Sequence, residues 1–312
     1  AIELLANTKK TRSDKRYVSL DVAYGIRARV HLTMHNYADA LKDAEAALAS
    51  TSSVPYSSAA VSKPTFIDIE DASWMWGILI TDKDRVSTTG ICNFPSHMGS
   101  LNYGYASVGG WRRISPKLYN QIPESDVRKG WFLDDTGVSV NLPAAAQAYI
   151  TKKGAPVYTQ VKYGPMNDEW GSNNNATDVI LMRVEEMYLI KAEAQAMNND
   201  VSGGVNTLNS FVNTYRDPSY KCTATTGEAV QEAVWHQRRI EFWGEGLAYF
   251  DIMRLNKGVN RLGCGFPKTA VFNIAAGDPV QIYSIPNKEV QYNPLLENNP
   301  LVSAPTPIPD EE

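Results

Sequence analysis

Aromatic rings placed among small and amide residues are the groups in this sequence best suited to hold a ligand. Six residues of this kind stand out in two polar stretches: Tyr103, Tyr105, Trp111, Trp170, Asn173 and Asn174. An indole or phenol ring offers a flat apolar surface to the C–H face of a sugar, and amides pair with sugar hydroxyls. Because each hydrogen bond gains only about 1 kcal/mol net, we expect micromolar to millimolar affinity. The pattern indicates carbohydrate binding, and the alternative is that each ring anchors its own loop.

A second set of side chains has the types needed either for acid catalysis or for simple ion pairing. Arg238 and Glu241 are three positions apart, with Glu245 one turn later, and Asp251 and Arg254 have the same spacing of three. On a helix each pair lies on one side, where opposite charges attract. Structural ion pairs are the favoured interpretation, because they need no catalytic purpose. The sequence contains no serine nucleophile elbow, phosphate-binding glycine loop or dinucleotide fingerprint, so we expect a protein that is not an enzyme.

Two histidines have the spacing of a metal-binding pair, since His31 and His35 are one helical turn apart. A metalloprotease motif requires Glu after the first histidine, but this chain has Leu32, and no third ligand is nearby in the sequence. The adjacent acids Asp134 and Asp135 point in different directions along a chain and do not indicate glycoside hydrolysis. We assign no metal site and no cofactor.

The composition excludes several classes of protein. The 312 residues include 30 Lys and Arg against 34 Asp and Glu, and a formal net charge of -4 does not suit a nucleic-acid-binding surface. Hydrophobic residues make up 43%, as in a globular chain that buries a large core. No apolar run approaches the roughly 20 residues of a membrane-spanning helix. Three cysteines, Cys92, Cys222 and Cys264, allow one disulfide at most.

A helical hairpin over residues 15–50 is the first element that can position the aromatic loops. Val22, Ile26 and Val30 form one helical stripe, and a break at His35 precedes a second helix. The second helix is rich in alanine, which permits close helix approach, and the intervals are similar to those of a tetratricopeptide repeat. We therefore predict an antiparallel pair of helices.

The segment 179–256 repeats this pattern. Residues 184–215 are expected to form a second hairpin, and residues 227–244 a third long helix for which Thr226 is a candidate cap. Recurrence of the hairpin strengthens the prediction of a mainly α scaffold built from tetratricopeptide-like units.

A long insertion, residues 51–178, separates the two helical regions and is rich in Gly, Ser, Asn, Pro and aromatic residues. Loops of this length are usually functional or disordered, and the Trp and Tyr content argues against disorder. Within it, the alternation of Trp74 and Trp76 indicates a strand with both indoles on one face, toward the core. Residues 257–312 are expected to be irregular and to end in an extended, proline-spaced acidic tail.

Several sequence motifs occur in order along the chain, at residues 113–128, 183–194, 238–246, 249–254 and 285–300. The second reads R-V-E-E-M-Y-L-I-K-A-E-A and the third R-R-I-E-F-W-G-E-G. In type, order and spacing these motifs resemble those of the SusD/RagB family of outer-membrane nutrient-binding lipoproteins, over nearly the whole chain. Gln237, Ala248, Leu255 and Gly204 depart from the family pattern at positions that concern scaffold contacts.

The resemblance implies a single SusD-like domain over residues 1–312 that lacks an N-terminal part. Family members begin with a lipidated cysteine and earlier helices, which have no counterpart before Ala1. It also implies a non-catalytic protein at the cell surface that captures glycans and delivers them to a TonB-dependent SusC-like outer-membrane transporter. Attachment to the outer membrane would be through a lipid anchor outside this chain, and no nucleic acid would be bound.

Two other functions stay open at this stage. Capture of peptides or glycopeptides is the first, and it would favour a polar groove with main-chain pairing and fewer stacked rings. The second is a helical-repeat scaffold whose ligand is another protein, with the aromatic residues as hot spots. The sequence names neither the sugar nor its linkage.

Overall fold

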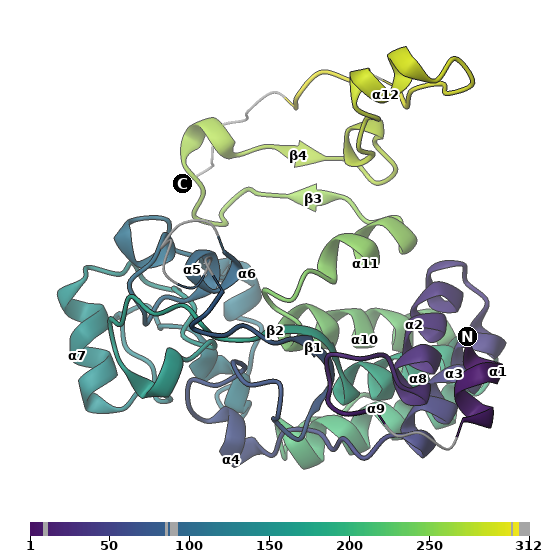
Figure 1. Ribbon diagram of the computed structural model, residues 1–312, viewed down its shortest axis with the longest axis horizontal. Coiled ribbons are helices and arrows are strands. Elements are labelled where there is room, and N and C mark those ends of the chain that lie inside the picture. The colour runs from purple at the N-terminus through teal and green to yellow at the C-terminus, as the bar shows by residue number, and fades with distance from the viewer. Residues whose placement is uncertain (9–11, 85–86, 88–92, 301, 306–312) are drawn as a thin grey trace. The chain divides into compact units, whose positions relative to one another are not determined.

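The computed structural model describes residues 1–8, 12–84, 87, 93–300 and 302–305 (Figure 1). The chain forms two compact units: the larger unit comprises residues 1–114 and 118–246, and the smaller unit residues 115–117 and 247–312. The expectation of one domain over residues 1–312 stays a prediction. None of the described helices combines the length and the apolar character needed to cross a membrane.

Helices dominate the larger unit and confirm the mainly α class. Its long helices are α2 (Leu20–Thr33), α3 (Tyr37–Ser50), α8 (Val184–Met197), α9 (Val201–Tyr215) and α10 (Gly227–Glu241), and a short α1 (Ile2–Asn7) precedes them. Helix α2 packs against α3, α3 against α8, and α8 against both α9 and α10. Both predicted hairpins are therefore present, while their likeness to tetratricopeptide repeats stays a prediction.

The core between α2, α3 and α8 depends on small side chains. The three alanines of α3 that face it, at positions 40, 44 and 47, are fully buried. The predicted stripe on α2 is wrong in part, because Val22 is buried but Ile26 and Val30 are 36% and 49% exposed. The buried side of α2 continues instead through Ala28 and Leu32. The reason is that α3 and α8 cover an alanine-rich side of α2, which lets the helices approach closely.

Helix α9 starts from a polar turn, as predicted, and packs unusually close to α8. Asp200 caps it by accepting a hydrogen bond from the backbone N–H of Gly203 at 2.8 Å. A Cβ atom at Gly204 would lie 2.6 Å from the carbonyl oxygen of Ala192 and 2.8 Å from the Cβ of Ala196. The glycine that departs from the family pattern is thus required by the contact between these two helices.

Helix α10 begins where the sequence predicts and ends earlier. The hydroxyl of Thr226 accepts a hydrogen bond from the backbone N–H of Ala229 at 3.2 Å, which confirms the cap. The helix ends at Glu241 and does not reach Gly244. Gly244 has φ +79°, a left-handed conformation that cannot continue a right-handed helix.

A two-stranded antiparallel sheet joins the insertion to the second hairpin, with β1 (Trp74–Ile78) paired to β2 (Val179–Arg183). The prediction that both indoles of β1 face the core together is wrong. Trp74 is fully buried in one apolar cluster, whereas Trp76 is partly buried and packs against another that includes Met75. A register irregularity between the two tryptophans interrupts the two-residue alternation.

The described part of the insertion contains only short regular elements, in agreement with the prediction of a loop-rich region. Besides β1, they are α4 (Ser58–Val61), α5 (Phe94–Met98), η2 (Ala106–Val108), α6 (Pro116–Tyr119), η3 (Val127–Trp131), α7 (Ala144–Lys152) and η4 (Met166–Asp168), where η denotes a 3-10 helix. Within the larger unit, α7 lies at the opposite end from the α2/α3 hairpin (Figure 1).

The smaller unit is mostly irregular, as predicted for the C-terminal segment. Its elements are α11 (Ala248–Arg254), β3 (Val259–Asn260) paired antiparallel with β4 (Asn273–Ile274), η5 (Lys268–Ala270), η6 (Pro279–Gln281) and α12 (Asn287–Tyr292). Cys264 in this unit and Cys222 in the larger unit are free thiols. The predicted extended tail falls largely on residues 306–312, which lie outside the described residues, as does Cys92.

Candidate ligand-binding site

Two loop segments that are distant in sequence run side by side in the larger unit. The backbone N–H of Gly171 donates to the carbonyl oxygen of Leu101 at 2.8 Å, and that of Tyr103 donates to the carbonyl of Ser172 at 2.7 Å. These hydrogen bonds bring the first aromatic stretch next to the asparagine run at 173–175. The structure thus unites the two polar stretches that the sequence analysis considered separately.

Asn175 holds these segments together, although the sequence analysis did not single it out. Its side chain is fully buried, and its Nδ2 donates to the carbonyl oxygens of Tyr103 at 3.4 Å and Asn173 at 3.2 Å. Its Oδ1 accepts a hydrogen bond from the amide of Asn102. No sequence signal distinguishes Asn175 from the two asparagines before it, because only the approach of the other segment gives it this role.

The two asparagines proposed as ligand contacts have different environments. Asn174 uses both ends of its amide within the protein, because Nδ2 donates to Asp82 Oδ1 at 2.6 Å and Oδ1 accepts from the backbone N–H of Ala176 at 3.0 Å. Asn173 has an exposed side chain. Asn173 is therefore the better placed of the two to meet a ligand, and Asn174 shapes the loop.

The two proposed indoles share one support. Trp111 and Trp170 are each partly buried and pack against the same apolar cluster, which consists of Leu101, Leu133, Ala146, Ile150 and Val161. This cluster fixes part of each indole and leaves the rest accessible to solvent. Neither ring is sealed inside the fold, so both satisfy the first requirement for a stacking surface.

Tyr103 is 48% exposed and lies beside two residues that the sequence analysis missed. The ammonium nitrogen of Lys153 is 5.5 Å from the ring centre of Tyr103 and 5.7 Å from that of Tyr149. The hydroxyl of Tyr149 donates to the carbonyl oxygen of Asn102 at 3.2 Å, and its ring packs against the same apolar cluster as the indoles. The spacing of four between Tyr149 and Lys153 at the end of α7 was the available signal.

Tyr105 is 43% exposed, but its ring already has polar neighbours. It stacks on His97 with ring centres 4.6 Å apart, and the guanidinium of Arg112 lies 5.6 Å from its centre. A Cβ atom at Gly110 would lie 2.6 Å from the Tyr105 ring. Tyr105 thus anchors its own loop to a larger extent than Tyr103 does.

We group Tyr103, Trp111, Tyr149, Trp170 and Lys153 under the name aromatic face, because Trp111, Tyr149 and Trp170 pack on one apolar cluster and Lys153 lies near Tyr103 and Tyr149. Its rings are partly exposed and its supporting cluster is buried. Amide and ammonium groups lie at its edge. Such a surface suits a ligand that has both flat C–H faces and hydroxyl groups.

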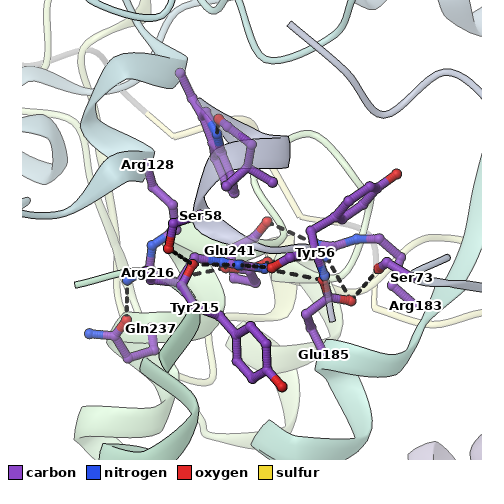
Figure 2. A network of polar contacts seen from close by, with 12 residues as sticks. Tyr56, Ser58, Ser73, Arg128, Arg183, Glu185, Tyr215, Arg216, Gln237 and Glu241 are labelled. Atoms are coloured by element: carbon purple, nitrogen blue, oxygen red, sulfur yellow. Dashed lines mark hydrogen bonds and ion pairs between the residues drawn. The ribbon is translucent and has the colours of Figure 1, made fainter. Parts of the chain in front are cut away.

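Glu241, one of the acids that the sequence analysis weighed as catalytic, is buried among arginine side chains (Figure 2). Glu241 Oε1 accepts hydrogen bonds from Arg183 at 3.1 Å and from Arg216 at 2.8 Å, and its Oε2 accepts from Arg216 at 2.8 Å and Arg128 at 3.3 Å. Burial alone would raise the pKa of Glu241, but these three guanidinium groups hold it well below its usual range. The group therefore stays ionised and inaccessible, as expected of a structural ion pair.

Lys162 extends this network of buried charges. It donates to Glu245 at 2.5 Å and to the carbonyl oxygen of Glu241 at 3.0 Å, and Arg183 also binds Glu245 at 2.9 Å. Burial lowers the pKa of Lys162 to about 8, against the attraction of Glu245. The cations that pair with Glu241 and Glu245 are distant from them in sequence. Spacing along a helix does not predict such pairs.

The remaining side chains considered in the sequence analysis have partners that are close to them in sequence. Asp251 and Arg254 form an ion pair at 2.8 Å, as their spacing of three predicts. His31 lies 3.7 Å from Asp43, and His35 stacks on Tyr37, so the two histidines have separate neighbours. Among the described residues, no group of three or more His, Cys, Asp or Glu side chains is arranged to hold a metal ion.

The sequence profile of the SusD family matches residues 128–301. No curated protein sequence matches the chain.

Solved structures of low sequence identity share the fold. A SusD-like carbohydrate binding protein from Bacteroides vulgatus is 24% identical with a TM-score of 0.64, and the match covers 83% of this chain and 51% of that one. A SusD superfamily protein from Bacteroides thetaiotaomicron is 22% identical with a TM-score of 0.74, covering 96% and 64%. Another from Bacteroides vulgatus is 20% identical with a TM-score of 0.69, covering 96% and 64%. The chain thus spans between half and two thirds of the length of these proteins.

Proposed function

Because the chain belongs to the SusD family, whose profile covers more than half of it, we propose that it is a non-catalytic protein that binds oligosaccharides. The observation that supports this most directly is the aromatic face, with its partly exposed rings over a rigid apolar cluster. A protein of the same fold is described as carbohydrate binding. The resemblance found in the sequence and the geometry of the loops therefore lead to the same ligand class.

Stacking on these rings provides the main part of the binding energy in this proposal. Covering roughly 100 Å² of ring surface contributes about 2.5 kcal/mol at about 25 cal/mol per Å². Two or three such rings, reduced by the cost of immobilising a flexible glycan, give micromolar to millimolar affinity. Asn173 and Lys153 would orient the sugar by hydrogen bonds to its hydroxyls.

Binding without cleavage is supported by the state of the acids. Glu241 and Glu245 have buried side chains that are fully engaged with arginine and lysine. A glycosidase needs two carboxyl groups that flank the bond to be broken. Carboxyl groups that are buried in ion pairs do not reach such a bond.

We further propose that the protein is lipid-anchored at the outer face of the outer membrane and passes its ligand to a TonB-dependent SusC-like transporter. This step rests on family membership. In this arrangement the helical hairpins would offer a rigid surface to the transporter, while the loops at the other end of the larger unit hold the glycan.

The test is retention of glycans by the 312-residue protein in affinity electrophoresis and isothermal titration against a panel of plant, fungal and host polysaccharides. We expect at least one glycan to bind, with loss of about 2–3 kcal/mol in the Trp111→Ala/Trp170→Ala variant. Tyr292→Ala, which removes an exposed ring of the smaller unit, is the matched control and should bind normally.

Three outcomes would count against the proposal. Unchanged binding by the double tryptophan variant would exclude the aromatic face as the site. Heat with peptides and none with any glycan would indicate peptide capture instead. Release of smaller sugars from a bound glycan would show that the protein is an enzyme.

A further inference from the structure

The larger unit contains a cavity of about 480 Å³ that shares no residue with the aromatic face. Its wall contains part of η3 and the turn that follows Phe132, and it includes Tyr119, Lys129, Asp134, Asp135 and Tyr158. Small-molecule sites typically have volumes of roughly 300–1,000 Å³. The cavity is therefore large enough for a mono- or disaccharide.

Two tyrosine rings meet in this wall. The ring centres of Tyr119 and Tyr158 are 5.1 Å apart with an angle of 58° between the ring planes. Tyr158 has φ +65°, a left-handed conformation that bulky residues rarely adopt and that costs on the order of 1–3 kcal/mol. Two hydrogen bonds of 3.0 Å hold it there: its backbone N–H donates to the carbonyl oxygen of Leu133, and its carbonyl oxygen accepts from the backbone N–H of Ile114. Strain of this kind concentrates at functional sites.

Asp134 presents a fixed carboxylate to the same cavity. Its Oδ1 accepts three hydrogen bonds, from the backbone N–H of Thr136 at 2.8 Å, the hydroxyl of Thr136 at 2.7 Å and the backbone N–H of Val138 at 2.9 Å. The backbone N–H of Gly137 is a further donor beside this carboxylate. Burial raises the pKa of Asp134, but these donors outweigh it and lower the pKa overall. An ionised, immobilised carboxylate thus lies in the cavity wall, where a ligand can meet it.

The charge of the wall decides which ligands fit. Glu124 is paired with Lys129 at 2.5 Å, and Asp126 with Arg128 at 2.6 Å. Within the described part of the chain, the two acids at 134–135 have no such ion-pair partner. The cavity therefore has excess negative charge, which attracts hydroxyl and ammonium donors and repels carboxylate or sulfate groups.

We propose that this cavity is a second sugar-binding pocket, which takes a neutral or amine-bearing sugar unit and excludes acidic sugars. Tyr158 would contact the C–H face of the sugar ring, supported by Tyr119, which is buried beside it with Lys129 5.0 Å from its ring centre. The Asp134 carboxylate would accept hydrogen bonds from hydroxyl or ammonium groups of the sugar. The inference rests on the proposed function for the class of ligand, but it uses a different surface. It adds a charge-based selectivity that the aromatic face does not provide.

The experiment is fluorine NMR of the full 312-residue chain labelled with 3-fluorotyrosine. Tyr119→Phe and Tyr158→Phe proteins assign the two signals among the 16 tyrosines. The probes are glucose, galactose, mannose, xylose, arabinose and glucosamine, with glucuronate as the anionic match to glucose. Concentrations extend to roughly 100 mM, well above the millimolar range expected for one stacked ring and a few hydrogen bonds.

We expect at least one neutral or amine-bearing sugar to shift both signals saturably, and glucuronate to shift neither. Tyr158→Asn should weaken this binding on the order of tenfold, since asparagine tolerates the left-handed backbone but removes the ring. Asp134→Asn should weaken it similarly and allow glucuronate to bind, because the amide retains the acceptor for the loop and removes the charge.

The proposal is overturned if no sugar shifts the two signals, or if glucuronate shifts them as strongly as glucose does. Its failure is distinguishable from failure of the proposed function. The shifts at Tyr119 and Tyr158 are expected to persist in the Trp111→Ala/Trp170→Ala protein, whereas polysaccharide retention is not. Loss of both responses together in that protein would show that the cavity is not a separate site.

Discussion

Replacing Glu241 by glutamine tests the buried charge network with a change of almost no volume. The network joins four cations, Arg128, Lys162, Arg183 and Arg216, to four anions, Asp126, Glu185, Glu241 and Glu245. Figure 2 shows its centre, where Arg128, Arg183 and Arg216 surround Glu241. Glutamine leaves four cations and three anions in the same dry volume. It also turns an NH₂ donor toward guanidinium groups that themselves only donate.

The expected cost follows from burial. Glu241 and the three arginines around it have essentially no solvent exposure. Removal of one partner from a buried ion pair typically costs about 3–5 kcal/mol, because the remaining charge is not solvated. A protein with about 5–15 kcal/mol of total stability loses a large part of it. We therefore expect Glu241→Gln to lower the free energy of unfolding by about 3–5 kcal/mol.

The assay is urea unfolding followed by tryptophan fluorescence, which reports on the larger unit because all seven tryptophans lie in it. At roughly 1–3 kcal/mol per molar urea, the midpoint should fall by about 1 M or more. The matched control is Glu45→Gln, which removes an exposed acid paired with Lys191 at 3.0 Å and should cost at most about 1 kcal/mol. Equal destabilisation by the two variants would refute the argument that burial gives the network its importance.

Two further predictions concern α9 and Lys162. Gly204→Ala should destabilise the larger unit by about 1–3 kcal/mol in the same assay, because the new Cβ meets Ala192 and Ala196, and a stabilised variant would contradict this contact. The pKa of Lys162 is lowered from 10.5 to about 8, so between these pH values the unfolded chain binds a proton that the folded chain releases. The stability of the natural protein relative to Lys162→Met should therefore rise with pH from 8 to 10.5 and stay constant just below 8. The stability difference between the two proteins is measured by urea unfolding at each pH. A difference that stays constant or falls between pH 8 and 10.5 would contradict a lowered pKa of Lys162.

The helical scaffold was predictable because its signals are local. Thr226 caps α10 through the next turn of the chain, and the polar turn before Val201 separates α8 from α9. The spacing of apolar residues indicated both hairpins. The predicted apolar stripe through Ile26 gave the wrong buried side of α2, because the neighbouring helices decide which side is covered.

The candidate site was only partly predictable. Residue type identified Tyr103, Trp111 and Trp170 as suitable rings, and the structure gives the two indoles one common support. Residue type did not separate Asn174, which is engaged in the loop, from Asn173, which is exposed. These differences arise from hydrogen bonds to segments elsewhere in the chain.

The sequence by itself determined the family, the mainly α class and the position of both hairpins, because motifs, periodicity and caps act over a few neighbouring residues. Only the tertiary structure decided that Glu241 is surrounded by arginines from three distant segments, that Lys153 lies near two tyrosine rings, and that Tyr119 and Tyr158 share a cavity wall. The physical reason is that long-range contacts depend on how apolar surfaces pack against one another, and the spacing of residues along a chain does not determine that packing.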